Sequence, residues 1–176
     1  MIAKYQDRLT ILLFIAYLLM LIGIVLFKLP FYSETLTDIR VVNLIPLQGS
    51  FDENGDLLLK EVFYNFLLFM PLGVYLSLLK TSWSFKKKVI VIICLSLALE
   101  TIQFVFAIGR SDVTDVLSNT LGGIIGLVFC AFLGVVFKRR SSKIIRFLVV
   151  MSTICAVIYF AYLFWLSHFV MKPPTI

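Results

Sequence analysis

The sequence predicts an all-α protein, a polytopic membrane helix bundle of five transmembrane helices with the N-terminus inside and the C-terminus outside. Three observations lead to this prediction. Of the 176 residues, 61% are hydrophobic and only 15% are charged, whereas soluble domains average about 45–50% apolar and about 25% charged residues. Apolar runs long enough to cross a bilayer recur along the whole chain. The connections between these runs alternate between rich and poor in Lys and Arg.

Five apolar segments approach or exceed the length of about 20 residues that a helix needs to cross the hydrocarbon core. They lie at 9–27, 62–79, 89–108, 116–137 and 144–166. No small-residue cleavage site follows the first segment, so we expect a retained anchor rather than a signal peptide. The longest remaining piece, 28–61, is too short for a separate catalytic domain. We therefore expect residues 1–176 to form a single integral membrane domain.

The basic residues are divided unequally between the two sides of this bundle. Eleven of the 16 Lys and Arg residues lie before the first span, between the second and third, or between the fourth and fifth with the first turn of the fifth included. The positive-inside rule makes that side cytoplasmic, so 28–61 becomes an extracytoplasmic loop. Topology and attraction to anionic headgroups account for the net charge of +6, and we expect no nucleic-acid partner.

Polar side chains within the spans gather toward the expected outer side. Glu100 is an acid inside the third span, and Gln103 follows on the same face one turn later. Placing a charged side chain at a helix centre costs about 2.5–3.5 kcal/mol, so such residues are functional candidates. Asn65 in the second span and Asn119 in the fourth lie at similar depth. Three spans therefore deliver polar groups to one region of the outer half.

The turn before the fourth span adds further candidates. It contains Arg110, Asp112 and Asp115, and the two acids continue in one helical stripe to Asn119. Asp112 could instead cap the fourth helix, with Asp115 in its first turn. Similarly, the two buried asparagines could form hydrogen bonds between helices. A pairing of Ser111 or Ser118 with His168 as nucleophile and base is also left open.

The loop 28–61 contains an organised stretch at 40–47, in which Arg40 and Asn43 stand among apolar residues. We expect this stretch either at the membrane surface or folded into the bundle. Two further groups have structural interpretations. Gly122, Gly123 and Gly126 suit close helix packing, and three cysteines, Cys94, Cys130 and Cys155, suit small buried apolar side chains.

These stretches resemble the motifs of the VanZ-like family of bacterial membrane proteins, and they occur in the family's order. They run from Arg40 to Pro46, from Asn65 to Gly73, from Glu100 to Gln103 and from Gly109 to Gly123. The resemblance implies a multi-pass protein of the bacterial plasma membrane with a role in resistance to teicoplanin and related glycopeptide and lipoglycopeptide antibiotics. Thr114 stands where the resemblance leads us to expect another acid, which counts against a three-carboxylate metal site.

Three mechanisms compete at this stage. The first is binding of a lipid-linked cell-wall intermediate or the lipidated antibiotic in a polar cavity of the outer leaflet, lined by Arg40, Asn43, Asn65, Glu100, Gln103, Arg110, Asp112, Asp115 and Asn119. The second is a membrane enzyme that modifies a lipid-linked envelope substrate with Glu100, Asp112 and Asp115 as catalytic candidates. The third is a small transporter. We expect membrane lipids as partners and no cofactor or resident metal, and homo-oligomerisation stays open.

Overall fold

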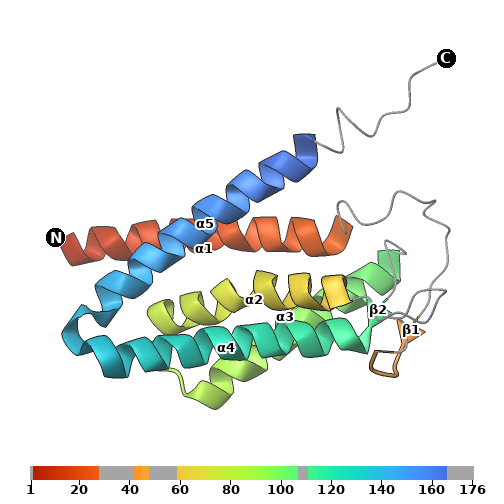
Figure 1. Cartoon of the computed structure of the whole chain (residues 1–176), viewed down its shortest axis with the longest axis horizontal. Coiled ribbons are helices and arrows are strands. Elements are labelled where there is room, and N and C mark those ends of the chain that lie inside the picture. Colours follow the sequence, from red (N-terminus) through yellow and green to blue (C-terminus); the bar gives the residue numbers. More distant parts are fainter. Residues whose placement is uncertain (1, 28–41, 48–58, 107–110, 166–176) are drawn as a thin grey trace.

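Five long helices form the protein, which we describe from a computed structural model over residues 2–27, 42–47, 59–106 and 111–165 (Figure 1). The helices are α1 (Ile2–Phe27), α2 (Leu59–Leu79), α3 (Phe85–Phe106), α4 (Val113–Phe137) and α5 (Ser141–Trp165). A single 3-10 turn, Lys138–Arg140, joins α4 to α5. Two strands of two residues each, β1 (Val42–Asn43) and β2 (Ser111–Asp112), complete the described part of the chain.

Each expected span corresponds to one of these helices, although residues 107, 108 and 166 of the expected spans lie outside the described part of the chain. All five helices are long and apolar enough to cross a membrane. Only 17% to 33% of each span is buried inside the bundle. The remaining surface is apolar, as at Leu19, Phe106 and Val135, which are 68%, 71% and 75% exposed. Such a surface suits lipid rather than water. The prediction of an all-α bundle with five helices long and apolar enough to span a membrane is confirmed, whereas the inside and outside assignment of the termini stays a prediction.

The most extensive helix contact in the described chain joins α2 and α4, which run side by side in the same direction (Figure 1). Glycines bring the two backbones together. A Cβ atom at Gly122 would overlap the carbonyl oxygen of Phe66, and one at Gly126 would overlap that of Met70. Gly73 of α2 lies equally close to the backbone of Gly123. The prediction that these glycines permit close helix packing is therefore confirmed.

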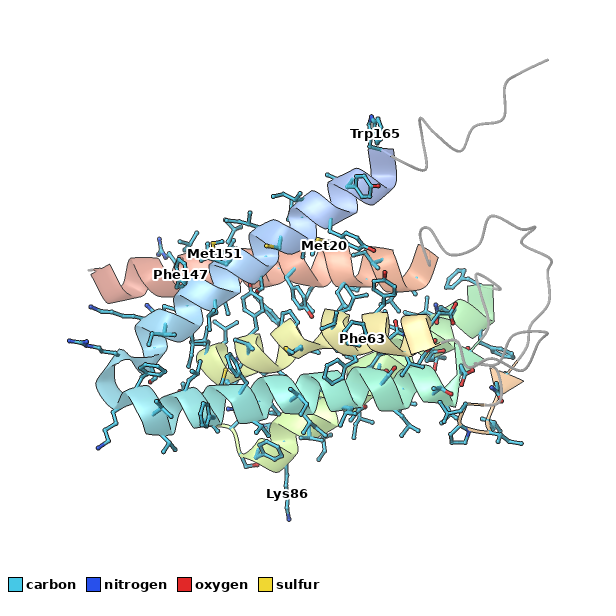
Figure 2. All side chains as sticks on the ribbon, in the orientation of Figure 1. Met20, Phe63, Lys86, Phe147, Met151 and Trp165 are labelled. Atoms are coloured by element: carbon cyan, nitrogen blue, oxygen red, sulfur yellow. The ribbon has the colours of Figure 1, made fainter. Side chains whose placement is uncertain are left out.

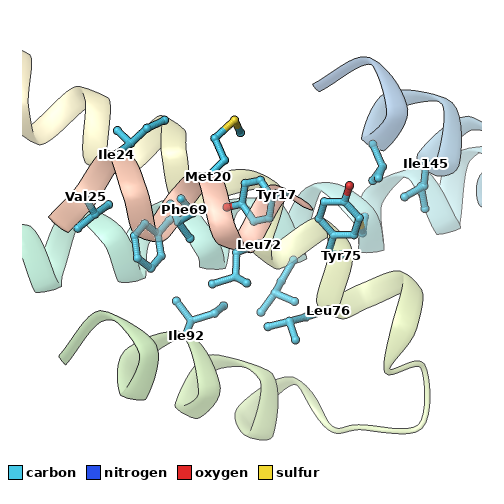
Figure 3. Packing of buried hydrophobic residues seen from close by; sticks show 14 of the residues in the cluster. Tyr17, Met20, Ile24, Val25, Phe69, Leu72, Tyr75, Leu76, Ile92 and Ile145 are labelled. Atoms are coloured by element: carbon cyan, nitrogen blue, oxygen red, sulfur yellow. The ribbon is translucent and has the colours of Figure 1, made fainter. Parts of the chain in front are cut away.

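The apolar core lies where α1 and α5 cover the α2–α4 pair, and Figure 3 shows part of it around Tyr17, Phe69 and Leu72. The rings of Tyr17 and Tyr75 stack there, with their centroids 5.4 Å apart. The Tyr75 hydroxyl lies 2.6 Å from Thr153 Oγ1. Thr153 donates its own proton to the Val149 carbonyl, so Tyr75 is the donor in this pair. The hydrogen bond joins α2 to α5 within the apolar core.

Pro71 stands inside α2 and has no N–H to continue the helical hydrogen-bond ladder. The carbonyl group that loses its donor is that of Leu67, four residues earlier. Beside it, the Tyr17 hydroxyl of α1 donates to the Leu68 carbonyl at 2.6 Å. This hydrogen bond joins α1 to α2 one residue after the carbonyl group that proline leaves without its helical donor.

The end of the bundle where α2 and α4 finish and α3 and α5 begin is basic (Figure 2). Its exposed cations include Lys86, Lys138 and Arg140. Trp83 lies in the connection from α2 to α3, where Lys80 Nζ is 5.2 Å and Lys87 Nζ 4.5 Å from its ring centroid. Aromatic rings close to basic side chains are typical of a protein surface at the membrane–water interface.

The cysteines differ in part from what their sequence context predicts. Cys130 is buried, as expected, but Cys94 and Cys155 are exposed on α3 and α5. The prediction that all three are buried is wrong for these two. The physical reason is that a span can present a thiol to lipid as readily as to the protein interior, because the group is nearly apolar.

Candidate functional site

The sequence-predicted polar residues that the structure describes lie at the end of the bundle opposite the basic end. Helices α2 and α4 begin there and α3 ends there, beside β1 and β2 (Figure 1). Oxygen-bearing side chains gather in this region, away from Lys86, which projects from the start of α3 (Figure 2). The expected convergence of residues from three helices is thus present in the fold.

A short parallel bridge forms the outermost layer of the site. Val42 pairs with Ser111 and Asn43 with Asp112 in the β1–β2 register. The Asn43 amide donates to Asp112 Oδ2 at 2.9 Å. Four residues beyond the strand, the Leu47 N–H donates to Thr114 Oγ1 at 2.9 Å. The stretch 42–47 is therefore fastened to the start of α4, in the manner of an extra strand.

Asp112 is the N-cap of α4. Its backbone is extended, and its Oδ1 accepts from the Thr114 N–H at 2.7 Å. The other carboxylate oxygen binds Asn43, so one side chain both begins the helix and holds the neighbouring loop. The capping interpretation is confirmed for Asp112, and Asp115 lies in the first turn as expected.

Glu100 connects the end of α3 to this cap. It is only 6% exposed, and its Oε2 accepts from the Asp112 backbone N–H at 3.0 Å. The Ser111 hydroxyl donates to the Glu100 carbonyl at 2.7 Å. A backbone N–H donor stabilises the ionised form of a carboxylate. The segment that leads into α4 is therefore bound twice to the same residue of α3.

Asp115 connects α4 to α2. It is 5% exposed, and its Oδ1 accepts from the Asn65 amide at 2.7 Å. The Ser118 hydroxyl donates to the Asp115 backbone carbonyl at 3.1 Å. The interhelical interpretation of Asn65 is thereby confirmed. Two carboxylates with little solvent exposure, Glu100 and Asp115, stand on adjacent helices at one end of the bundle.

Two fully buried amides extend the polar region beyond the acids. Asn119 extends it toward the basic end, and Gln103 extends it toward α1. The Asn119 amide donates to Ser96 Oγ at 2.9 Å and joins α4 to α3. The Gln103 amide donates to the Val25 carbonyl at 2.8 Å. That carbonyl is in the last turn of α1, where helical donors are missing. Gln103 thus binds α1 rather than α2 or α4.

Among the described residues, the side-chain oxygens of Gln103, Asn119 and Thr120 accept no hydrogen bond although they are buried. Buried acceptors in folded proteins are nearly always satisfied. These oxygens are almost completely shielded from solvent, so only a donor that enters the bundle can satisfy them.

The Asn119–Ser96 pair gives a direct test of this helix contact. In a double-mutant cycle with Asn119→Ala and Ser96→Ala, we expect a coupling free energy of about 0.6–1.7 kcal/mol, the range for hydrogen bonds within membranes. Unfolding midpoints in mixed detergent micelles measure it. Thr101 bonds within its own helix, to the Leu97 carbonyl, so Thr101→Ala should be additive with Asn119→Ala. Equal coupling free energies in the two cycles would contradict a specific Asn119–Ser96 hydrogen bond.

Some predicted residues lie outside the part of the chain that the structure describes. These are Arg40, Arg110 and His168. The two serines considered as nucleophiles, Ser111 and Ser118, donate their hydroxyl protons to backbone carbonyls. Across the described residues, no group of three or more His, Cys, Asp or Glu side chains is arranged to hold a metal ion.

Sequence reasoning missed several contributors. The Ser96 hydroxyl accepts from the Asn119 amide, yet isolated hydroxyl residues in apolar spans are too common to stand out. In the sequence, Thr114 stands out only as the place of an expected acid, whereas its hydroxyl accepts from the Leu47 N–H. The spacing of Ser96 and Glu100 held a signal, because residues four apart lie on the same face of a helix. The β1–β2 bridge gave no such signal, because a strand of two residues has no periodicity.

The fold and this polar end define a class: a multi-pass membrane protein with a hydrogen-bonded acidic and amide cluster where two parallel helices begin. A protein-family model described as VanZ/LLP1 matches residues 14–137, and the chain belongs to this family. The matched region contains α2, α3, α4 and most of α1, and hence every described residue of the polar end.

A curated relative agrees with this assignment. The chain is 39% identical over 113 residues to "Protein VanZ" of Enterococcus faecium. The alignment covers 63% of this chain and 66% of the relative, so the match spans just under two thirds of the relative's length. No solved structure matches the chain.

Proposed function

We propose that this protein contributes to resistance to teicoplanin-type glycopeptide antibiotics in the bacterial plasma membrane. In this proposal it binds a lipid-linked cell-wall intermediate or the lipidated antibiotic at the polar end of the bundle, which faces outward. The family membership supports the resistance role, because the VanZ-like family is associated with it. The observation that carries the binding role is the cluster of buried carboxylates and amides between lipid-exposed helices.

An amphipathic ligand fits the two kinds of surface that meet at this end. Glu100 and Asp115 offer carboxylates, while the oxygens of Gln103 and Asn119 offer additional acceptors. Exposed apolar side chains such as Leu117 and Leu121 on α4 lie within two turns of Asp115. A polar headgroup with amide or ammonium donors can meet the acceptors while an acyl chain lies along the helices.

Arg40 and Arg110 are the proposed contacts for the anionic part of such a ligand. Both residues flank described site residues in sequence, Arg110 immediately before Ser111 and Arg40 three positions before Asn43. Guanidinium groups bind phosphate and carboxylate in bidentate fashion. A lipid-linked precursor with a phosphate, or a glycopeptide with a carboxylate, therefore suits this set.

The test compares Glu100→Gln and Asp115→Asn with the wild type, expressed equally in a glycopeptide-susceptible host. We expect both variants to lose most of the teicoplanin resistance. Hydrogen bonds to charged groups contribute about 1.5–3 kcal/mol, so ligand binding by the purified variants should fall roughly ten- to hundred-fold. Glu61→Gln is the matched control, because Glu61 is an acid in the first turn of α2 outside the cluster. Unchanged susceptibility for both site variants, with folding preserved, would refute the proposal.

A second arm of the experiment separates binding from chemistry and transport. Purified protein is incubated with candidate lipid-linked intermediates, with and without EDTA, and the products are analysed. Binding without turnover is the expected result. Turnover would assign Glu100, Asp112 and Asp115 to a membrane enzyme instead, and ligand flux across reconstituted vesicles would indicate a transporter.

A further inference from the structure

The loop stretch 42–47 exposes apolar side chains although it is fixed to the bundle. Leu44 is 75% exposed and Ile45 59%, and Val42 and Leu47 are 48% and 40% exposed. Pro46 is exposed as well, and the stretch contains no charged residue. A loop in water seldom presents consecutive large apolar side chains in this way.

The outward direction of these side chains is fixed by hydrogen bonds of the loop itself. Asn43 uses its amide on Asp112, and its Oδ1 accepts from the Ile45 N–H at 3.2 Å. At the other end of the stretch, Leu47 has φ 66, a left-handed conformation that is unusual for leucine, and its N–H binds Thr114. The polar atoms of the loop thus face the start of α4, and its apolar side chains face away.

The length of α4 places this loop relative to a bilayer. Its 25 residues extend about 37 Å at 1.5 Å per residue, which exceeds the hydrocarbon thickness of about 30 Å. The far end of α4 runs directly into Lys138 and Arg140, which are exposed cations and belong beside headgroups and water. The β2 end, where the loop is fastened, therefore falls in the opposite headgroup layer.

The apolar loop also continues a surface that already faces lipid. On α4, Leu117 and Leu121 are each 53% exposed, and on α2 Phe63 is 57% exposed near the same end. We propose that the stretch 42–47 inserts its apolar side chains into the headgroup–acyl boundary of the bilayer and so acts as an interfacial membrane contact. Segments of this kind bury their apolar face about 5–10 Å into that boundary. The inference holds whatever ligand the polar cluster binds.

Tryptophan fluorescence of the full chain in lipid nanodiscs tests this inference. The indole is introduced by Leu44→Trp, and separately by Ile45→Trp, in a background that carries Trp83→Phe and Trp165→Phe. Val128→Trp is the matched reference, because Val128 is 49% exposed in the middle of α4. The quenchers are lipids brominated either near the glycerol end or near the chain end, and aqueous iodide.

For both loop variants we expect blue-shifted emission and a larger fluorescence loss with lipids brominated near the glycerol end. The Val128→Trp reference should show the reverse preference. Emission and iodide quenching like those of free tryptophan amide, without loss to brominated lipid, would place the loop in water and overturn the inference. Protection from both quenchers would mean that protein, such as a second copy of the chain, covers the loop, and this would overturn it as well.

Discussion

Gly126→Ala is expected to destabilise the bundle strongly, whereas Gly134→Ala in the same helix is expected to leave it unchanged or slightly more stable. A Cβ atom at Gly126 would overlap the backbone carbonyl of Met70, while one at Gly134 would meet no atom within 4 Å. Backbone cannot move aside as the end of a flexible side chain can. Overpacking of this kind costs about 1–3 kcal/mol, and separation of α2 from α4 would cost more.

The pair of variants isolates packing from helix propensity. Alanine is about 0.8–1.0 kcal/mol more favourable than glycine within a helix, and both substitutions share this gain. The difference between their unfolding midpoints, measured by circular dichroism in mixed micelles, therefore reports the α2–α4 contact alone. Equal midpoints for the two variants would contradict the close backbone approach.

The second large effect is expected at Asp112, where substitutions can separate its structural role from its proposed role in ligand binding. Asp112→Ala removes the cap of α4 and the acceptor for Asn43, and loss of a cap costs about 0.5–2 kcal/mol. Asp112→Asn retains one capping oxygen, since asparagine caps helices as well as aspartate does, but it removes the charge and replaces the oxygen that accepts from Asn43 with a donor.

The two Asp112 variants should therefore differ in stability but not in resistance. We expect Asp112→Ala to lower the unfolding midpoint and to lose resistance. Asp112→Asn should keep the cap of α4 and so unfold at a higher midpoint than Asp112→Ala, and it should still lose much of the resistance, because its carboxylate charge and its acceptor for Asn43 are gone. Midpoints and teicoplanin susceptibility are measured on the same expressed proteins. Full resistance in Asp112→Asn would restrict this residue to helix capping.

Much of the fold could be predicted because membrane spans have a strong compositional signal. Five apolar runs correspond to five helices. Helix α1 begins seven residues before its expected span, and every other described start differs from the expected limit by at most four residues. The fourth helix begins three residues earlier than its expected span, at Val113, because Asp112 caps it. The end of an apolar run marks where the hydrocarbon core of the membrane begins. A helix, in contrast, begins where its first N–H groups find acceptors.

The sequence predicted which residues belong to the candidate site, but not which hydrogen-bond partner each of them has. Buried polar residues in apolar spans are costly, so Glu100, Asn65 and Asn119 stood out at once. Which partner each side chain binds depends on how the helices rotate and align. Gln103 shows the limit of the sequence pattern: it shares a face with Glu100, yet its amide binds α1. No spacing within one helix contains that information.

The glycine contact also restricts how the protein can move. Because no side chains separate α2 from α4 at Gly122 and Gly126, neither helix can rotate or slide by a turn without driving larger groups into backbone. The two helices therefore form one rigid body, and the Asn65–Asp115 hydrogen bond is held within it. If the polar end admits a ligand as proposed, we expect displacement of α1, α3, α5 or the stretch 42–47 against this pair rather than separation of α2 from α4.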